Sequence, residues 1–253
     1  MKKFIYIASV FGFILIATAL FRFFFFSVTP ANASKMTETT NFQLPSISEQ
    51  ELGISFALPA PDIEGGVSLG KALSLRRSIR RYEDKPLSIF ELSQILWSGQ
   101  GVTNERGFRT APSAGATFPL DLYVVVNNVD GLANGLFQYL HNSHELKMIS
   151  PNIDVEALSR GCLGQRMIND AGAVVIFAAI FERTTARYGE RGIRYVHNEV
   201  GHASQNIHLM AASLDLGTVV IGAYRDDEVE EILNLGENIN VLYLMPVGKT
   251  RSQ

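Results

Sequence analysis

Four arginines surround a single serine in the stretch RRSIRR, residues 76–81. A guanidinium group can bind two phosphate oxygens at once, and a serine hydroxyl can donate to an oxygen that remains. Arg76, Arg77, Ser78 and Arg80 therefore predict a site for a phosphate group. The alternative interpretation is a solvated surface, which is the usual role of a charged run.

The composition limits what this arginine cluster (residues 76–80) binds. The chain has 253 residues and a formal net charge of −3, with 47% hydrophobic and 19% charged residues. A slightly acidic chain offers no broad basic surface, so nucleic acid is not an expected partner. The single cysteine, Cys162, cannot form a disulfide within the chain, and no cluster of Cys and His has the spacing of metal ligands. We therefore expect one globular domain with a local site for an anion.

Residues 1–33 predict a signal peptide or an N-terminal membrane anchor. A basic start precedes an apolar run over residues 4–21, and the small residues Ala31 and Ala33 fit a cleavage site. The run is also long enough to stay uncleaved, with membrane contact through residues 4–28. Both alternatives predict an exported, extracytoplasmic domain, because the basic start favours an inside amino terminus.

The rest of the chain predicts a linker followed by the folded domain. Residues 34–60 are polar and interrupted by proline, which is typical of a linker, and residues 61–253 carry the patterns of a globular domain. No G-x-G-x-x-G stretch follows a strand pattern, so a Rossmann cofactor site is not predicted.

The elements that must position the candidate residues follow from periodicity. Ser88 and Glu91 have the spacing of a capping box, which predicts a helix that ends at Gly99. Further patterns predict a long helix from Tyr195 to Leu216 with Gly217 as its stop. The remaining predictions are a helix-like segment at 65–75, a helix at 226–236, a hairpin over 135–150, and strands at 121–128, 171–181, 218–224 and 239–248. The whole is an α+β pattern.

Four motifs in order resemble the nitroreductase superfamily of flavin enzymes. They are RRSIRRY at 76–82, TAPSAGATFPLDLYVVV at 110–126, GHASQNIHLMAASLDLGTVVIGAY at 201–224 and LMPVGK at 244–249. The branch that they resemble most is that of the SagB/ThcOx-type dehydrogenases, and the resemblance covers about residues 64–249. It implies an α+β fold in which an antiparallel-rich central sheet is flanked by helices, and a homodimer with one FMN at each subunit interface.

The resemblance assigns roles to the arginine cluster. Arg76, Arg77 and Ser78 match the residues that hold the FMN phosphate and ribityl chain. Arg80 matches a cation at the N1/O2 edge of the flavin, where a fixed positive charge stabilises the anionic reduced ring. Arg80 is therefore predicted to be both a cofactor-binding and a catalytic residue.

The PSAGA loop (residues 112–116) matches a loop that the second subunit lays against the flavin. Pro112, Ser113, Ala114 and Gly115 are the predicted cofactor-binding residues, because small residues permit close approach to a flat ring. A simple turn is the alternative interpretation, since proline, serine and glycine are common turn residues.

Four further residues match cofactor-binding positions of the family. Gly222 and Ala223 fall where the backbone donates a hydrogen bond toward flavin N5, the atom that exchanges hydride. Lys249 matches a basic position that reaches the phosphate. Gln165 lies just before a strand, where relatives direct a polar side chain toward the flavin or substrate, and a surface loop is the alternative there.

One departure from the family concerns the substrate. Members that oxidise azolines carry a Lys-Tyr pair at the start of the long helix, whereas this sequence has Arg194 and Tyr195. Arginine stays protonated in proteins and cannot replace lysine as a base. Tyr195 is the predicted catalytic residue that could exchange a proton, and packing is the alternative role.

We therefore predict an FMN-dependent oxidoreductase that transfers hydride through flavin N5 between a small-molecule electron donor and a small organic acceptor. Two alternatives stay open: a flavin-fold protein that binds a ligand without turnover, and a peptide azoline dehydrogenase. Arg81 is left without a role in the site and is expected to face water or to pair with a nearby carboxylate.

Overall fold

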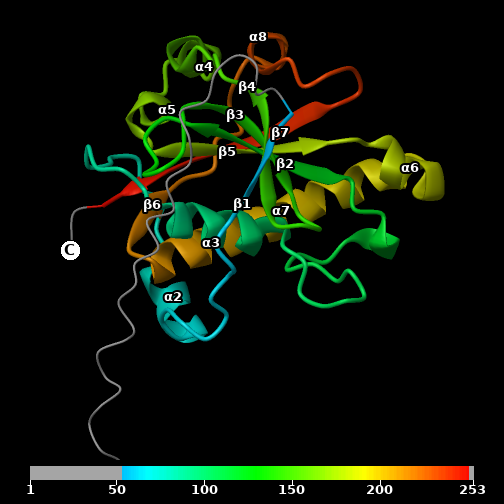
Figure 1. The fold of residues 1–253 in the computed structure, drawn as a ribbon. Helices are drawn as coiled ribbons and strands as arrows, with labels where there is room; N and C mark the ends of the chain where they lie inside the picture. Colours follow the sequence, from blue (N-terminus) through cyan, green and yellow to red (C-terminus); the bar gives the residue numbers. More distant parts are fainter. Residues whose placement is uncertain (1–52, 251–253) are drawn as a thin grey trace, which may run out of the picture. The chain divides into compact units, whose positions relative to one another are not determined.

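A seven-stranded antiparallel sheet forms the centre of residues 53–250, the part of the chain that this computed structural model describes (Figure 1). The strand order is β1-β4-β3-β2-β5-β7-β6. The strands are β1 (Ser55–Ala57), β2 (Leu120–Val126), β3 (Gly135–Leu140), β4 (Glu145–Ser150), β5 (Ala173–Ala179), β6 (Leu216–Thr218) and β7 (Asn240–Lys249).

Helices cover both faces of this sheet (Figure 1). Helices α3 and α7 lie on one side, and α4, α5 and α8 lie on the other. The helices are α2 (Leu69–Leu75), α3 (Ile89–Gln100), α4 (Val155–Gly161), α5 (Met167–Asp170), α6 (Glu182–Tyr188), α7 (Arg191–Ser213) and α8 (Asp226–Leu233), and Ala114–Ala116 forms the short 3-10 helix η2. The predicted α+β architecture with a central antiparallel sheet and flanking helices is confirmed.

The continuous apolar runs of the central strands are explained by burial on both faces. Along β5, Val175 and Phe177 pack into the cluster under α3 and α7. Their neighbours Val174 and Ile176 pack into the cluster under α4, α5 and α8. Side chains of a strand alternate between the faces of a sheet, so a strand covered on both sides needs apolar residues at every position.

Helix α3 starts where its capping box predicts. The Ser88 hydroxyl accepts a hydrogen bond from the Glu91 amide at 3.2 Å, and the Glu91 carboxylate accepts one from the Ser88 amide at 2.8 Å. The helix ends at Gln100 with Gly101 as its cap, one residue beyond the predicted end at Gly99. The predicted hairpin and the strands β2, β5 and β7 are also confirmed, as is helix α8.

The predicted boundaries of the long helix and of the strand at 218–224 differ from the structure. Helix α7 ends at Ser213, and the chain turns at Asp215 with a φ of 55°, so that Gly217 lies in β6 rather than at the helix end. The predicted strand 218–224 is mostly outside β6 and keeps only an isolated bridge from Ile221 to β7. These differences arise because pairing with β7 decides where the edge strand lies.

The fold begins inside the segment that was predicted to be a linker. Strand β1 pairs with β4, and the side chains of Phe56 and Leu58 are buried. The predicted signal peptide or anchor and the membrane contact through residues 4–28 lie outside the described residues. Among residues 53–250, no helix is long and apolar enough to cross a membrane.

The arginine cluster follows α2 directly and is fixed to the edge of the sheet. Ser78 forms a parallel bridge with Thr218 of β6, and the Ile79 amide donates to the Thr218 carbonyl at 2.9 Å. The Tyr82 hydroxyl lies 3.0 Å from the Ile79 carbonyl and 3.1 Å from the Pro246 carbonyl, so it links this segment to β7. The cluster is therefore held by backbone pairing and not only by flexible side chains.

We expect Gly248→Ala to weaken this attachment. A Cβ at position 248 would lie 2.6 Å from Cγ of the Tyr82 ring, so the ring must shift. The free energy of unfolding should fall by about 1–3 kcal/mol, the usual cost of overpacking. Urea denaturation measures the change. The matched control is Gly70→Ala in α2, where a Cβ meets no atom within 4 Å; an equal loss in both variants would contradict the packing argument.

Candidate functional site

A hollow of about 280 Å³ lies between the arginine cluster, the end of α7 and β6. Its polar lining consists of Arg77, His208, Asp215, Thr218 and Thr250, and the remaining wall is apolar. We call it the His208 hollow. It combines guanidinium, imidazole and hydroxyl groups, which are suited to an oxygen-rich anion.

Two buried polar atoms in this hollow have no hydrogen-bond partner among the described residues. They are Nδ1 of His208 and Oγ1 of Thr218, whose residues are 8% and 2% exposed. A buried polar group without a partner costs about 1–3 kcal/mol, so native proteins rarely leave one unpaired. These atoms therefore fit a site at which a bound group supplies the missing partners.

The electrostatics of the hollow favour a bound anion. Burial, and to a smaller extent the positive charge of Arg76, lower the pKa of His208 to about 4. The imidazole is therefore neutral at pH 7 although a carboxylate, Asp215, lies on the same wall. An anionic ligand would reduce the repulsion between Arg76 and a protonated imidazole.

The residues that are predicted to bind phosphate differ in their exposure to solvent. Arg76 is half-buried, whereas Arg77, Ser78 and Arg80 are exposed. The Arg77 guanidinium donates to the carbonyls of Ser74 at 3.2 Å and Arg76 at 2.7 Å. The cluster therefore presents Ser78 and Arg80 to solvent while Arg77 also caps the end of α2.

Lys249 lies at the end of β7, where its ammonium pairs with α3. Its Nζ atom donates to Oε1 of Glu91 at 2.5 Å, and both side chains are partly buried. Lys249 would reach a phosphate only by sharing its ammonium with this carboxylate. Its predicted role as a cofactor ligand stays a prediction.

The structure brings together predicted residues that are distant in sequence. The Gln165 side chain donates to the Ala223 carbonyl at 2.9 Å, across 58 positions of the chain. Gly222 and Ala223 are exposed, and the ring of Tyr243 lies behind Gly222. Because Gly222 follows Thr218 by four residues, this segment continues directly from the strand that holds Ser78. Gln165, Gly222 and Ala223 thus lie on the same sheet edge as the arginine cluster.

The PSAGA loop is a tight turn held by side chains from α6. Gly115 has a φ of 59°, and the Arg187 guanidinium donates to its carbonyl at 3.1 Å. A Cβ at this position would lie 2.4 Å from the Tyr188 hydroxyl, so a larger residue there would strain the backbone and displace this side chain. The Tyr195 ring packs edge-on against Tyr188, with the ring centroids 5.1 Å apart. Tyr195 therefore packs against Tyr188, and its predicted catalytic role stays a prediction.

The loop and the arginine cluster lie at different points along α7. Ser113 of the loop approaches Glu199, whereas Arg76 approaches His208. Nine residues of α-helix separate Glu199 from His208, a distance of about 14 Å. Within one chain, the loop and the arginine cluster therefore approach α7 at points about 14 Å apart.

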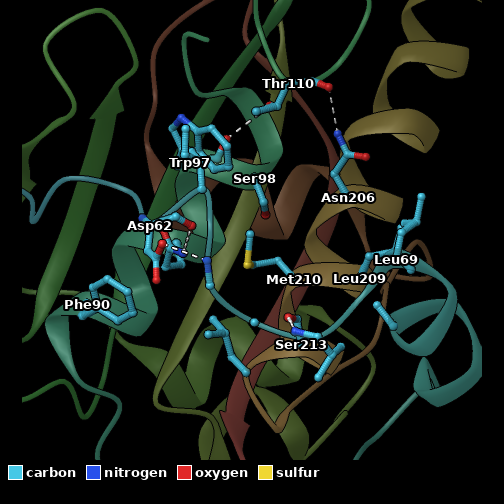
Figure 2. Close-up of a pocket in the computed structure, with 17 residues that line it drawn as sticks. Asp62, Leu69, Phe90, Trp97, Ser98, Thr110, Asn206, Leu209, Met210 and Ser213 are labelled. Carbon is cyan, nitrogen blue, oxygen red and sulfur yellow. Dashed lines mark hydrogen bonds between the residues drawn. The ribbon is translucent and has the colours of Figure 1, made fainter. Parts of the chain in front are cut away.

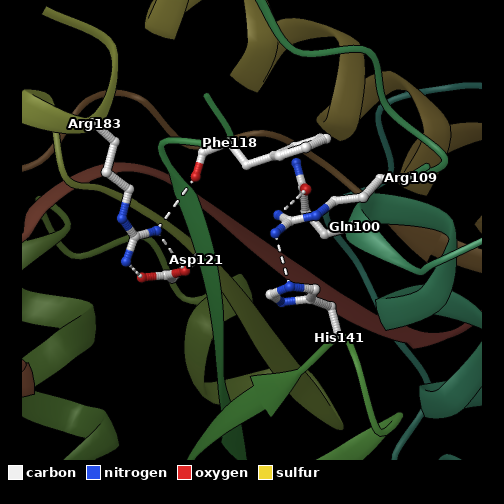
Figure 3. A network of polar contacts seen from close by, with 6 residues as sticks. All are labelled: Gln100, Arg109, Phe118, Asp121, His141 and Arg183. Atoms are coloured by element: carbon white, nitrogen blue, oxygen red, sulfur yellow. Dashed lines mark hydrogen bonds and ion pairs between the residues drawn. The ribbon is translucent and has the colours of Figure 1, made fainter. Parts of the chain in front are cut away.

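A network of polar side chains lies beside the PSAGA loop (Figure 3). Arg109 donates to Oε1 of Gln100 at 2.9 Å, and its other terminal nitrogen lies 2.7 Å from Nε2 of His141. Arginine only donates, so Nε2 of His141 accepts and the ring is neutral. The Arg109 guanidinium also lies over the Phe118 ring, 4.2 Å from its centroid. Arg109 is therefore a fixed cation whose own hydrogen bonds go to neutral groups.

An ion pair lies next to this network. Arg183 binds both carboxylate oxygens of Asp121 at 2.9 Å, in a bidentate arrangement, and also donates to the Phe118 carbonyl at 3.3 Å. Figure 3 shows Asp121 turned toward Arg183 and away from Arg109. The charge of Asp121 is therefore balanced by Arg183.

Glu199 is the carboxylate that remains near Arg109. It is 2% exposed on the buried side of α7, and its Oε1 atom has no hydrogen-bond partner among the described residues. Burial raises the pKa of Glu199 to about 7, although nearby Ser113, Arg109 and Gln100 oppose this increase. The carboxyl group is therefore shared between its neutral and charged forms at physiological pH.

A larger hollow of about 430 Å³ lies between α2, α3 and α7 (Figure 2). Apolar side chains such as Leu69, Trp97 and Met210 dominate its wall. Its polar groups pair with one another, as the amide of Asn206 does with the Thr110 carbonyl at 3.1 Å. It lacks the unpartnered polar atoms of the His208 hollow and is a less suitable site for an anion.

Sequence reasoning missed Glu199, Arg109, His208 and Thr218 as site residues. One signal was present, because Glu199 and His208 fall in the apolar stripe of α7. A polar residue in such a stripe must be buried, and buried polar residues gather at sites of binding or catalysis. Within residues 53–250, no group of three or more His, Cys, Asp or Glu side chains could hold a metal ion.

The nitroreductase family model matches residues 73–249 of the chain. A protein of Methanocaldococcus jannaschii that is named as a nitroreductase is 48% identical over 198 residues, which are 78% of this chain and 98% of that protein. The microcin B17-processing protein McbC of Escherichia coli is 26% identical over 135 residues, 51% of this chain and 49% of McbC. The similarity to McbC agrees with the predicted dehydrogenase branch.

Solved structures have the same fold. A protein of Ralstonia eutropha JMP134 that is named as a nitroreductase superposes with a TM-score of 0.66 at 25% identity, over 83% of this chain and 95% of the other. The NADPH:FMN oxidoreductase of Vibrio harveyi superposes with a TM-score of 0.52 at 20% identity, over 73% of this chain and 69% of the other. The predicted nitroreductase-like fold is confirmed.

The raised pKa of Glu199 predicts a pH-dependent stability. The folded chain binds the carboxyl proton more tightly than the unfolded chain, whose ordinary value is 4.5. The contribution of the neutral carboxyl is fully present below pH 4.5 and is lost as the pH rises through about 7. Glu199→Gln removes this loss, so the variant should gain on the order of 3 kcal/mol over the wild type between pH 5 and pH 8.

Urea denaturation at the two pH values measures this difference. Glu237→Gln makes the same chemical change at an exposed position and should follow the wild type. A Glu199→Gln variant that also follows the wild type would contradict the raised pKa.

Proposed function

Because the chain belongs to the nitroreductase family, we propose that it is an FMN-dependent oxidoreductase that moves two electrons, as a hydride, between a reductant and a small organic acceptor. The observation that carries this proposal is the His208 hollow, which is lined by Arg77 and by His208 and Thr218, each of which has a buried polar atom without a hydrogen-bond partner among the described residues. The shared fold with a named NADPH:FMN oxidoreductase supports FMN as the bound group.

The residues of the arginine cluster and the hollow would hold the phosphate and ribityl chain. Guanidinium groups of Arg76 and Arg77 would bind phosphate oxygens, with hydroxyl donors from Ser78 and Thr218. The bridge from Ser78 to Thr218 fixes two of these donors relative to one another before any ligand arrives. Binding then costs little additional ordering of the backbone.

The neighbouring sheet edge, at Gly222 and Ala223, would contact the flavin ring. Bound flavin would supply the atom that accepts and releases the hydride. The positive charge of the Arg80 guanidinium would stabilise negative charge on the reduced ring. The backbone at Gly222 and Ala223 is exposed and is held by the hydrogen bond from Gln165, which suits an oriented amide donor.

We further propose a homodimer in which each site takes the arginine cluster from one chain and the PSAGA loop from the other. The arrangement follows the family resemblance, in which the second subunit lays this loop against the flavin; within one chain the two groups approach α7 about 14 Å apart. Tyr195 would contribute by packing Tyr188 under Gly115 and so shaping the loop.

Reconstitution with FMN tests the function. The purified chain should become yellow, and bound flavin reduced by dithionite should be reoxidised rapidly and saturably by a quinone or a nitroaromatic compound. A colourless protein after reconstitution would refute the proposal. Bound FMN without acceptor turnover would favour a ligand-binding protein, and oxidation of a peptide azoline would favour the azoline dehydrogenase.

The extracytoplasmic location is proposed from the sequence alone. An intact leader of the signal or anchor type, residues 1–33, should direct the domain across the membrane. Added protease should then digest the domain in intact spheroplasts, while a cytoplasmic marker survives. Protection of the domain until the spheroplasts are lysed would contradict this location.

Two arginine variants test the assignment of the cluster. Arg76→Ala should weaken FMN binding by about 1.5–3 kcal/mol, the usual worth of a hydrogen bond to a charged group. Arg81→Ala should leave the affinity nearly intact, because Arg81 is exposed and follows the bridged segment. Titration of the cofactor-free protein with FMN, followed by flavin fluorescence, measures both. Equal losses would mean that the arginines act as one diffuse patch.

A further inference from the structure

The Gln165 side chain reaches from the turn after α4 to the exposed backbone at Ala223. Its side-chain nitrogen, Nε2, donates to the Ala223 carbonyl at 2.9 Å. The backbone amide of Arg225 donates to the Gly161 carbonyl at the end of α4, also at 2.9 Å. These two hydrogen bonds lie on adjacent peptide groups, so together they restrict backbone rotation on both sides of Tyr224.

The sheet holds this backbone on either side of Ala223. On the amino side, Ile221 and Leu244 of β7 exchange backbone hydrogen bonds at 2.8 and 3.0 Å. On the carboxyl side, the Tyr224 hydroxyl donates to the Val241 carbonyl of β7 at 2.6 Å. The hydrogen bond from the turn after α4 therefore falls between two points that β7 already fixes.

Two backbone amides in this stretch, those of Gly222 and Ala223, remain available to a ligand. Both residues are exposed, and neither amide has a hydrogen-bond partner among the described residues. The carbonyl and the amide of a peptide group are fixed in one plane, so a held Ala223 carbonyl prevents that peptide group from turning over. The hydrogen bond from Gln165 thus limits the backbone on one side of the two free amides, and the pairing of Ile221 limits it on the other.

A strained turn after α4 places Gln165 for this hydrogen bond. Leu163 and Gly164 both have left-handed backbone conformations, with φ of 59° and 71°. The left-handed conformation is unfavourable for leucine, and the Leu163 side chain is 54% exposed, so burial does not compensate for the strain. The Gly164 amide donates to the Ser159 carbonyl at 2.9 Å, and the Ser159 hydroxyl donates to the Gln165 carbonyl at 3.3 Å. Strain that the surrounding structure maintains in this way is typical of functional sites.

We propose that Gln165 is a positioning residue of the flavin site, which holds the Ala223 carbonyl so that the backbone amides of Gly222 and Ala223 keep the direction that a hydrogen bond to the flavin requires. This inference deepens the proposed function and rests on it for the identity of the bound group as FMN. The family resemblance directs the Gln165 side chain toward the flavin or substrate, whereas in this chain its nitrogen is engaged with the backbone. Gln165 acts through Ala223 and does not itself touch the flavin.

The first test needs no cofactor. Gln165→Met keeps the length of the side chain and removes its N–H donor. In the full chain without FMN, hydrogen exchange of the Arg225 amide should become about 10-fold faster, the upper range for loss of one neutral hydrogen bond. The matched control is Gln138→Met in β3, whose side chain has no hydrogen bond among the described residues. Unchanged exchange in Gln165→Met, or equal acceleration in both variants, would overturn the inference.

The second test uses the FMN-loaded enzyme with a quinone acceptor. Gln165→Met should lower kcat by about 10-fold, because the reaction depends on the geometry of the bound ring. The KM for the quinone and the dissociation constant of FMN should change by less than about 2-fold, since the residues assigned to the phosphate are untouched. An unchanged kcat refutes the positioning role, and a loss of FMN affinity as large as the loss of rate would make Gln165 a cofactor ligand instead.

A third variant separates positioning from a general structural role. Gln165→Glu has nearly the same shape, but an ionised carboxylate only accepts hydrogen bonds and cannot donate to the Ala223 carbonyl. Its rate relative to the wild type should be low at pH 7 and should recover as the pH falls through the pKa of the introduced carboxyl, ordinarily about 4.3, because the protonated form donates again. Gln165→Met should show no such recovery. A ratio for Gln165→Glu that does not change with pH would contradict the proposal.

The two proposals fail in distinguishable ways. A chain that binds no FMN refutes the proposed function, while the exchange of the Arg225 amide still decides whether Gln165 holds the backbone. A chain that binds FMN and turns over normally in Gln165→Met keeps the proposed function and refutes the positioning role alone.

Discussion

Burial of α7 against the sheet determines where chemistry can occur in this fold. The helix has 23 residues, about 35 Å of length, and its apolar stripe packs under the central strands and α3. Glu199 and His208 lie in that stripe and are both more than nine-tenths buried. A polar group on this buried face needs a hydrogen-bond partner, or burial shifts its pKa. The pKa values of Glu199 and His208 shift in opposite directions.

The opposite directions follow from the charge that each side chain would carry when ionised. Desolvation disfavours the charged form of both, so it raises the pKa of the Glu199 acid and lowers that of the His208 base. Near each residue stands an arginine that cannot lose its charge. For Glu199 the arginine opposes desolvation, which leaves the pKa of the acid near 7. For His208 the arginine adds to desolvation, which leaves a neutral ring.

The parts of this arrangement that sequence predicts are the local ones. The start of α3 follows from Ser88 and Glu91, which bond across three residues, and the strands follow from runs that are apolar on both faces. The end of α7 and the short β6 depend on pairing with β7, which periodicity does not contain. The resemblance to a flavin-enzyme family named the arginine cluster and the PSAGA loop, but not the buried residues behind them, because hydrophobic patterns do not say which polar residue in a stripe stays unpaired.

The attachment of the arginine cluster to β6 would couple a phosphate bound at the cluster to the position of the backbone amides at Gly222 and Ala223. Thr218 pairs with Ser78 and Ile79 on one side, and the chain then runs four residues to Gly222. The hydroxyl of Tyr82 holds the Ile79 carbonyl near that of Pro246 in β7, the strand that also pairs with Ile221. A shift of the cluster would therefore be transmitted to the backbone at Gly222 through short hydrogen-bonded steps. Ligand phosphate bound at one end would thus fix the geometry at the other, where flexible surface side chains alone could not.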